Sequence, residues 1–283
     1  DNLRDVSFAD AAHGWAVGVG GRIVATTDGG ANWAPQTSGV TNNLWAVRFV
    51  DAVRGWAVGE GGTIRATTDG GAAWAAQSSG TTGALYDAMF LDADEGWVVG
   101  AYSSGSSVRY TPDGGATWMA EPTGIPTTIT MRGVWFNPGG RGWVVGTSGT
   151  VRYTLNRGVS WSASGATGTT QTLWDVRFVD DSVGYVVGGA GVLLVTADGG
   201  LTWALRGTPV STVLYGVAFV DPLHGFLVGA AGTFVRTIDG GTSWTSHPAT
   251  TSRDLRGASF LTADDGWVAG DYGTILRTFS GGE

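Results

Sequence analysis

The sequence predicts an all-β protein, a seven-bladed β-propeller, because two short motifs recur in phase along the whole chain. The first motif is GWAVG, and its variants begin at Gly14, Gly55, Gly96, Gly142, Gly184, Gly225 and Gly266. The second is TTDGGANW at residues 26–33, and a version of it follows every copy of the first. Successive copies lie 41, 41, 46, 42, 41 and 41 residues apart, a period typical of one propeller blade.

Each repeat contains four short segments that favour β-strands. In the second repeat, the largely apolar segment LWAVRF (44–49) has the alternating pattern of a β-strand. WAVG (56–59) follows it after a polar turn. A Gly-rich turn leads to TIRATT (63–68), and the DGG turn leads to a segment that begins with Trp74. No segment has the apolar period of a helix, so we expect four-stranded antiparallel blades. The expected single domain, 1–283, has blades of approximate bounds 1–40, 41–81, 82–126, 127–169, 170–210, 211–250 and 251–283.

The last repeat is shorter than the others. Its second motif reads TFSGGE (278–283), with Ser280 in place of the aspartate, and no Trp-led segment follows it. No such segment precedes NLRDVSF (2–8) either. We therefore expect the last blade to be incomplete within this chain. Either this blade has three strands or the natural protein extends beyond these residues, and we favour the second explanation.

The two motifs together carry a family resemblance that covers essentially the whole chain. The S/T-x-D-x-G-x-T-W pattern resembles the Asp-box, also called the bacterial neuraminidase repeat (BNR). Its alternation with G-W-x-V-G resembles the photosystem II assembly and stability factor family. The resemblance implies a propeller that acts as a non-enzymatic assembly factor and binds protein partners. One scaffold hosts many activities, so the site must be argued from its own residues.

The second motif places one polar residue per blade in a hairpin, directly before its glycines. An aspartate there accepts hydrogen bonds from its own turn, while the glycines supply positive φ. A role in catalysis or calcium binding is the alternative, but one copy per blade separates these carboxylates far more than the roughly 5–10 Å of a catalytic pair. We therefore expect a structural role for Asp28, Asp69, Asp113, Asn156, Asp198 and Asp239.

A candidate partner-binding site follows from the residue just after the Leu or Met that opens each inner strand. In the seven blades this residue is Arg4, Trp45, Tyr86, Arg132, Trp174, Tyr215 and Arg256. Every member is aromatic or Arg, the types that dominate binding hot spots. The structural alternative is that these rings and guanidinium groups only pack between neighbouring blades and form no binding site. An insertion in the third repeat (100–110) adds Tyr102 to the same expected face.

Inner-strand charges offer a second candidate. Asp5, Asp87 and Asp175 recur in phase and share a strand face with Arg48 and Arg177. Catalytic acids are one interpretation. We favour paired charges that line the central channel.

Composition excludes several other functions. The chain has no Cys, and its formal net charge of −8 with a pI near 4.7 disfavours nucleic acid as a partner. It has no long apolar run for direct membrane insertion, and its three His do not form a metal set, so we expect no cofactor or metal. Glutamates are scarce, and the segment typical of sialidases is absent.

We therefore predict a non-enzymatic propeller in an extracytoplasmic setting, which is periplasmic, lumenal or extracellular, with no signal segment in this chain. A protein from a membrane-protein complex or a surface assembly would dock on the aromatic and arginine face. Two alternatives stay open: a structural domain of a larger surface protein, and a carbohydrate-binding or glycosidase-like Asp-box propeller.

Overall fold

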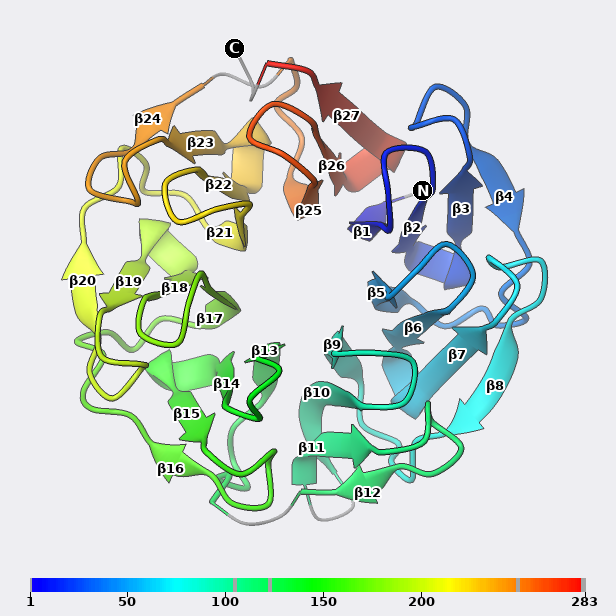
Figure 1. Cartoon of the computed structure of the whole chain (residues 1–283), viewed down its shortest axis with the longest axis horizontal. Coiled ribbons are helices and arrows are strands. Elements are labelled where there is room, and N and C mark those ends of the chain that lie inside the picture. Colours follow the sequence, from blue (N-terminus) through cyan, green and yellow to red (C-terminus); the bar gives the residue numbers. More distant parts are fainter. Residues whose placement is uncertain (1, 104–105, 122–123, 248–249, 281–283) are drawn as a thin grey trace.

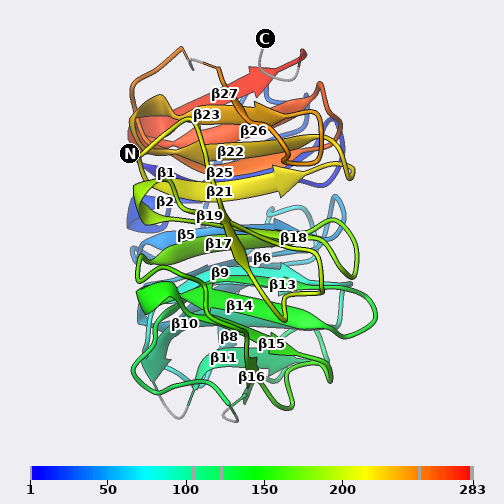
Figure 2. The same cartoon turned by 90° about the vertical axis from the view of Figure 1, so that its left-hand side faces the viewer.

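Seven antiparallel sheets are arranged radially around a central axis in the computed structural model (Figure 1). The structure describes residues 2–103, 106–121, 124–247 and 250–280. The ring is flattened along its axis, and all blades lie side by side around it (Figure 2). Six sheets have four strands, and the last has three in the described part of the chain. The predicted all-β seven-bladed propeller with an incomplete last blade is therefore confirmed.

The strands follow the same radial order in every blade, from the axis to the rim. The inner strands are β1 (Leu3–Phe8), β5 (Leu44–Phe49), β9 (Leu85–Phe90), β13 (Met131–Phe136), β17 (Leu173–Phe178), β21 (Leu214–Phe219) and β25 (Leu255–Phe260). The second strands are β2 (Gly14–Gly18), β6 (Gly55–Gly59), β10 (Gly96–Ser103), β14 (Gly142–Gly146), β18 (Gly184–Gly188), β22 (Gly225–Gly229) and β26 (Gly266–Gly270).

The third and fourth strands form the outer half of each blade. The third strands are β3 (Ile23–Thr26), β7 (Thr63–Thr67), β11 (Ser106–Thr111), β15 (Val151–Thr154), β19 (Leu193–Thr196), β23 (Phe234–Thr237) and β27 (Thr274–Thr278). The fourth strands are β4 (Ala34–Gln36), β8 (Ala75–Ser78), β12 (Met119–Ala120), β16 (Ser162–Ala163), β20 (Ala204–Arg206) and β24 (Thr245–Ser246).

Short 3₁₀ turns join the second and third strands of all blades except the third. These turns are η1 (Val19–Gly21), η2 (Glu60–Gly62), η3 (Thr147–Gly149), η4 (Gly189–Gly191), η5 (Ala230–Gly232) and η6 (Asp271–Gly273). In the third blade the insertion lengthens the hairpin instead, so that Ser103 pairs with Ser106 across β10 and β11.

The core between neighbouring blades combines buried aliphatic side chains with aromatic stacks. Trp15 of β2 stacks on Phe49 of the next inner strand with ring centroids 3.5 Å apart. Its indole N–H donates to the Gly70 carbonyl in the second motif of that blade, at 3.0 Å. Trp74 packs edge to face with the same Phe49 ring, with centroids 5.9 Å apart and planes at 84°. Aromatic pairs of these geometries contribute about 0.5–1.5 kcal/mol each beyond the area that they bury, so the motif tryptophans stabilise contacts between blades.

The glycine that opens each second strand makes room for this stack. Gly55 pairs with Phe49, and a Cβ at Gly55 would lie 2.5 Å from the Phe49 ring. The two residues of the G-W dipeptide therefore have different roles. The glycine leaves room for the inner-strand Phe of its own blade, and the Trp stacks on the inner-strand Phe of the next blade.

The ring closes through the inner strands of its first and last blades. Strand β1 packs against β25 and β26. Phe8 stacks on Trp267 with centroids 3.6 Å apart, and the Trp267 indole donates to the Gly29 carbonyl at 3.0 Å. The arrangement of aromatic contacts at this closure is therefore the same as between the other blades.

Candidate functional site

A β-bulge near the start of each inner strand positions the seven candidate binding residues. Leu44 pairs with Gly59, but Ala46 pairs with Val58, so Trp45 is the extra residue between them. The same register shift occurs in all seven blades. A bulge places an extra side chain on the strand and changes its direction. Alternation along a regular strand does not predict this, and the sequence carries no clear mark of it.

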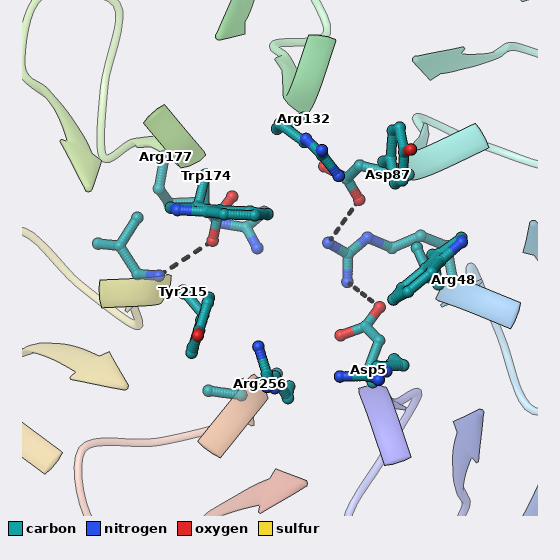
Figure 3. A pocket seen from close by; sticks show the side chains of 17 residues that line it. Asp5, Arg48, Asp87, Arg132, Trp174, Arg177, Tyr215 and Arg256 are labelled. Atoms are coloured by element: carbon teal, nitrogen blue, oxygen red, sulfur yellow. Dashed lines mark hydrogen bonds and ion pairs between the residues drawn. The ribbon is translucent and has the colours of Figure 1, made fainter. Parts of the chain in front are cut away.

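All seven bulge residues line one cavity of about 300 Å³ on the propeller axis. We call them the bulge ring: Arg4, Trp45, Tyr86, Arg132, Trp174, Tyr215 and Arg256. Figure 3 shows their side chains around the cavity, together with charged side chains from the same inner strands. Residues from seven separate blades therefore share one concave surface.

Neighbouring members of the bulge ring contact one another through rings and guanidinium groups. The Arg4 guanidinium carbon lies 5.0 Å from the centre of a Trp45 ring, and Trp45 lies 5.9 Å from Tyr86. Arg132 lies over Tyr86 at 3.8 Å and over Trp174 at 4.9 Å. These contacts hold flat groups against one another at the mouth of the cavity.

The other half of the bulge ring continues the pattern. Trp174 and Tyr215 meet edge to face at 5.5 Å, and Arg256 lies 4.2 Å from the Tyr215 ring centre. Asp271 at the start of η6 accepts from Arg256 at 3.0 Å and from Arg4 at 3.4 Å. Asp271 therefore joins the two ends of the series.

The arginines of the bulge ring differ in their charge environment. Burial lowers the pKa of Arg132. Burial also lowers the pKa of Arg4, and the nearby charge of Arg256 lowers it further. Burial has the same direction of effect at Arg256, but its hydrogen bond to Asp271 and the neighbouring charges raise its pKa overall. Asp271 thus compensates the charge on one side of the cavity mouth, while Arg132 lies between aromatic rings.

Beyond the bulge ring, the same cavity is lined by Asp5, Arg48, Asp87, Asp175 and Arg177. Arg48 lies 3.8 Å from Asp5 and 3.5 Å from Asp87, which gives the paired charges expected from the sequence (Figure 3). Burial lowers the pKa of Arg177, and the charge of Asp175 partly offsets this.

Each of the three cavity aspartates also joins its blade to the next one. Asp5 accepts from the Val47 backbone N–H, Asp87 from that of Val134, and Asp175 from that of Val217, all at 3.0 Å. These hydrogen bonds give the three carboxylates a structural role, which is to join neighbouring blades.

Burial raises the pKa of Asp87 to about 7, and the negative charges of Asp175 and Asp5 add to this against the opposing effect of Arg48. Burial likewise raises the pKa of Asp5. The charge of the cavity therefore depends on pH near neutrality. Sequence reasoning missed this property, because it arises from packing across blades.

The second-motif residues lie in separate blades, each within its own turn. Asp28 accepts from the Asn32 backbone N–H at 2.9 Å and from the Thr26 hydroxyl at 2.7 Å. Hydrogen bonds from Asn32 and Thr26 lower the pKa of Asp28 to about 2. In the fourth blade, Asn156 accepts the matching bond from Ser160 at 3.0 Å. The same contacts recur at Asp69, Asp113, Asp198 and Asp239.

Three further observations concern the described residues. Tyr102 lies in β10, but its side chain is outside the part that the structure describes. Among the described residues, no group of three or more His, Asp or Glu is arranged to hold a metal ion. No helix in the described part is both long and apolar enough to span a membrane.

Fold and site together define the class of this protein, a seven-bladed β-propeller with BNR-like turns and a charged, aromatic-lined central cavity. The model of the photosynthesis system II assembly factor YCF48 family matches residues 1–76, 72–167 and 207–283. The chain belongs to this family, which confirms the resemblance seen in the sequence. None of the curated proteins matches the chain.

Solved structures share the fold across nearly the whole chain. A structure described as YCF48 bound to D1 peptide has a TM-score of 0.80 at 24% identity and covers 99% of this chain and 92% of its own. YCF48 from Cyanidioschyzon merolae has a TM-score of 0.80 at 20% identity, with coverages of 98% and 95%. The GH74 xyloglucanase from Xanthomonas campestris has a TM-score of 0.76 at 12% identity, and the match covers 99% of this chain but 52% of the enzyme.

Proposed function

We propose that this protein is a non-enzymatic assembly module that binds an extended segment of a protein partner at the bulge ring. The observation that carries the proposal is the convergence of seven Arg, Trp and Tyr side chains from seven blades on one cavity. These residue types dominate protein-binding hot spots, because they offer flat apolar area and forked hydrogen bonding.

The charge of the cavity favours an acidic segment. Five arginines and three aspartates line it, although the whole chain has a formal net charge of −8. Asp271 pairs with Arg4 and Arg256, and Asp254 pairs with Arg256, so within the bulge ring the positive charge that a partner would meet is that of Arg132, which lies against aromatic rings. A local positive field inside a low-dielectric cavity attracts negative charge even when the net charge of the protein opposes it. The partner segment therefore carries carboxylates that meet the arginines and apolar groups that meet the rings.

Family membership supports a role in assembly, and a structure of similar fold contains a bound D1 peptide. We propose that the partner belongs to a membrane-protein complex and that binding takes place in an extracytoplasmic compartment. The xyloglucanase shares the fold but extends over about twice the length that this chain matches, so it lends little support to a hydrolytic role.

The test has two stages. A photo-crosslinking amino acid at position 86 identifies the partner, with the same probe at exposed position 205 on β20 as a control. Capture of that purified partner is then compared between the wild type and a Trp45→Ala, Trp174→Ala double variant. We expect the double variant to fold and to lose at least about thirtyfold in affinity, the scale of a hot-spot truncation.

A matched control removes two large apolar side chains from the outer part of a blade. Leu201 and Leu205 are 50% and 49% exposed, so Leu201→Ala with Leu205→Ala should leave capture unchanged. Undiminished capture by the Trp45, Trp174 double variant would refute binding at the bulge ring. Specific binding of an oligosaccharide to the same rings would favour the carbohydrate alternative.

A further inference from the structure

The 3₁₀ turn of the last blade has an unusual residue at its centre. In all six of these turns the middle residue has a positive φ, a conformation that favours glycine. This residue is Gly20, Gly61, Ser148, Ala190, Ala231 and, in the last blade, Tyr272. A bulky side chain at a φ of 59° strains the backbone, and residues held in this way cluster at functional sites. Tyr272 is therefore a candidate functional residue outside the bulge ring.

The Tyr272 side chain faces solvent on a fixed backbone. The residue is 72% exposed. The middle position is also exposed in the other five turns, so its exposure does not depend on the chain around Asn2. The Tyr272 backbone N–H donates to Asn2 Oδ1 at 2.9 Å. The guanidinium carbon of Arg253 lies 5.0 Å from the centre of the Tyr272 ring, so one face of the ring is covered and the rest is accessible.

Tyr272 and Arg253, which we call the blade-7 pair, lie beside the mouth of the cavity. Asp271 directly precedes Tyr272 and accepts hydrogen bonds from Arg4 and Arg256 of the bulge ring. Arg253 lies three residues before Arg256, in the segment that leads into β25. The surface of the blade-7 pair is therefore continuous with the bulge ring.

The charge of Arg253 is not neutralised by an acidic side chain. Arg253 is exposed and donates to two neutral oxygens, the Tyr272 carbonyl and the Thr274 hydroxyl, each at 3.4 Å. It forms no ion pair within the described ranges. Both hydrogen bonds are long, so the guanidinium can donate to a carboxylate as well. A flat ring next to an unpaired cation fits an aromatic side chain next to a carboxylate.

A second unpaired arginine lies on the far side of the cavity mouth. Arg132 contacts the rings of Tyr86 and Trp174 and forms no ion pair in the described part of the chain. Figure 3 shows Arg132 and Arg256 on opposite sides of the cavity, and Figure 1 shows the fourth and seventh blades across the ring from each other. An extended segment that reaches from Arg132 to the blade-7 pair would therefore cross the whole mouth.

We infer that the blade-7 pair is a second subsite, which binds an aromatic side chain next to a carboxylate in the partner segment. The partner ring packs against the accessible part of Tyr272, and its carboxylate accepts from Arg253. The inference rests on the function proposed above, because it concerns the same partner segment. Its consequence is an asymmetric arrangement, in which one end of the segment lies at the seventh blade and the other at Arg132.

The test uses the dipeptide N-acetyl-Asp-Trp-amide as a probe, with amide NMR spectra of the isotope-labelled protein. We expect saturable shifts at the amides of Tyr272 and Arg253 and a dissociation constant of about 1–10 mM, because two contacts on an exposed surface supply little free energy. The Asp-Ala dipeptide should bind at least about threefold more weakly, since it lacks the ring. The Asn-Trp dipeptide should bind at least about twofold more weakly, since it lacks the charge.

Matched variants test the two side chains separately. Tyr272→Gly removes the ring and relieves the strained backbone, so the variant should stay folded and bind the probe at least about threefold more weakly. Ala231→Gly is its control, because Ala231 has the same position in the sixth blade with a φ of 54°, and it should bind the probe as the wild type does. Arg253→Gln should weaken binding of the Asp-Trp dipeptide at least about twofold and leave binding of the Asn-Trp dipeptide unchanged.

The purified partner distinguishes failure of this inference from failure of the proposed function. A photo-crosslinking amino acid at position 272 should attach to the segment that position 86 identifies, and Tyr272→Gly should weaken capture at least about threefold. Loss of capture in the Trp45→Ala, Trp174→Ala variant with no loss in Tyr272→Gly would leave the proposed function standing and overturn the subsite. Undiminished capture by the double variant would refute the bulge ring, while dipeptide shifts at Tyr272 in that variant would still support the subsite.

Three results with the probe would overturn the inference. They are the absence of saturable shifts at the blade-7 pair, equal affinity of the wild type and Tyr272→Gly, and equal affinity for the Asp-Trp dipeptide and either altered dipeptide. Binding of cellohexaose at Tyr272 without binding of the dipeptide would also overturn it, since the subsite would then recognise carbohydrate.

Discussion

The guanidinium carbon of Arg132 lies 3.8 Å from the centre of the Tyr86 ring, although the two residues belong to neighbouring blades. The same guanidinium lies 4.9 Å from Trp174 on the following blade. Burial lowers the pKa of Arg132, so the charged form bears a desolvation cost that the two rings offset. A substitution of Arg132 can therefore show whether the bulge ring binds a partner or only stabilises the fold.

Arg132→Met keeps an unbranched apolar stem at this position and removes the charged guanidinium group. Desolvation and cation–π attraction oppose each other, so we expect the free energy of unfolding to change by less than about 1 kcal/mol. Affinity for the acidic partner should fall at least about tenfold. Urea denaturation and a binding titration measure the two effects, and Arg206→Met on exposed β20 is the control. A large loss of stability with unchanged affinity would make the bulge ring a structural wedge.

The second prediction concerns the pH dependence of binding. Burial raises the pKa of Asp87 to about 7, so a fall in pH from 8 to 6 protonates this carboxyl and makes the cavity more positive. The acidic partner should therefore bind more tightly at pH 6 than at pH 8. Asp87→Asn should bind equally at both values, close to the affinity of the wild type at low pH. A pH dependence that persists in Asp87→Asn would assign it to another group.

Asp87 should also affect stability with a defined sign. Its folded pKa is raised above the ordinary 3.8, so its contribution is fully present below that value and is lost as pH rises through about 7. Relative to Asp87→Asn, the wild type should lose stability over this window by at most about 1.4 kcal/mol per pH unit, because one proton is involved. Urea denaturation at a series of pH values measures the difference, and a gain in relative stability would contradict the raised pKa.

The number of blades and the identity of the bulge-ring residues could be predicted from the sequence, whereas their geometry could not. Two motifs in phase identify the repeat, and the position after Leu44 or its equivalents already shows a bias to Arg, Trp and Tyr. The register shift between Leu44 and Ala46 leaves no such signal, because a bulge depends on how two strands pair. The raised pKa of Asp87 depends on burial and on charges from other blades, which lie far apart in sequence.

A fourth prediction tests the second motif with two adjacent threonines. Thr67 is buried, and its hydroxyl accepts the Gly71 backbone N–H at 2.8 Å and donates to Asp69 at 2.8 Å. Thr67→Val removes these bonds, and a longer one from the Asp69 backbone N–H at 3.3 Å, without changing shape. It leaves the buried Gly71 N–H unsatisfied, which should cost about 1–3 kcal/mol. Thr68 is exposed, so Thr68→Val should change stability by less than about 0.5 kcal/mol. Equal effects of the two substitutions would show that the motif threonine does not stabilise its turn.

The last prediction concerns the space between inner strands. A Cβ at Gly133 would lie 2.9 Å from the Asp175 Cα and 2.9 Å from the Trp174 carbonyl oxygen, both of which are backbone atoms of the next blade. Backbone cannot move aside as a flexible side chain can, so Gly133→Ala should force β13 and β17 apart. We expect a loss of about 1–3 kcal/mol, the range for an overpacked core.

Separation of these strands should also disturb the cavity. Trp174 and Asp175 belong to the strand that is pushed, so partner affinity should fall together with stability in Gly133→Ala. Gly207→Ala is the matched control, because a Cβ there meets no atom within 4 Å and its φ is not positive. Thermal unfolding and the binding titration compare the two variants. If Gly133→Ala were as stable as Gly207→Ala, the close approach of β13 and β17 would be wrong, and with it the size of the cavity that these strands enclose.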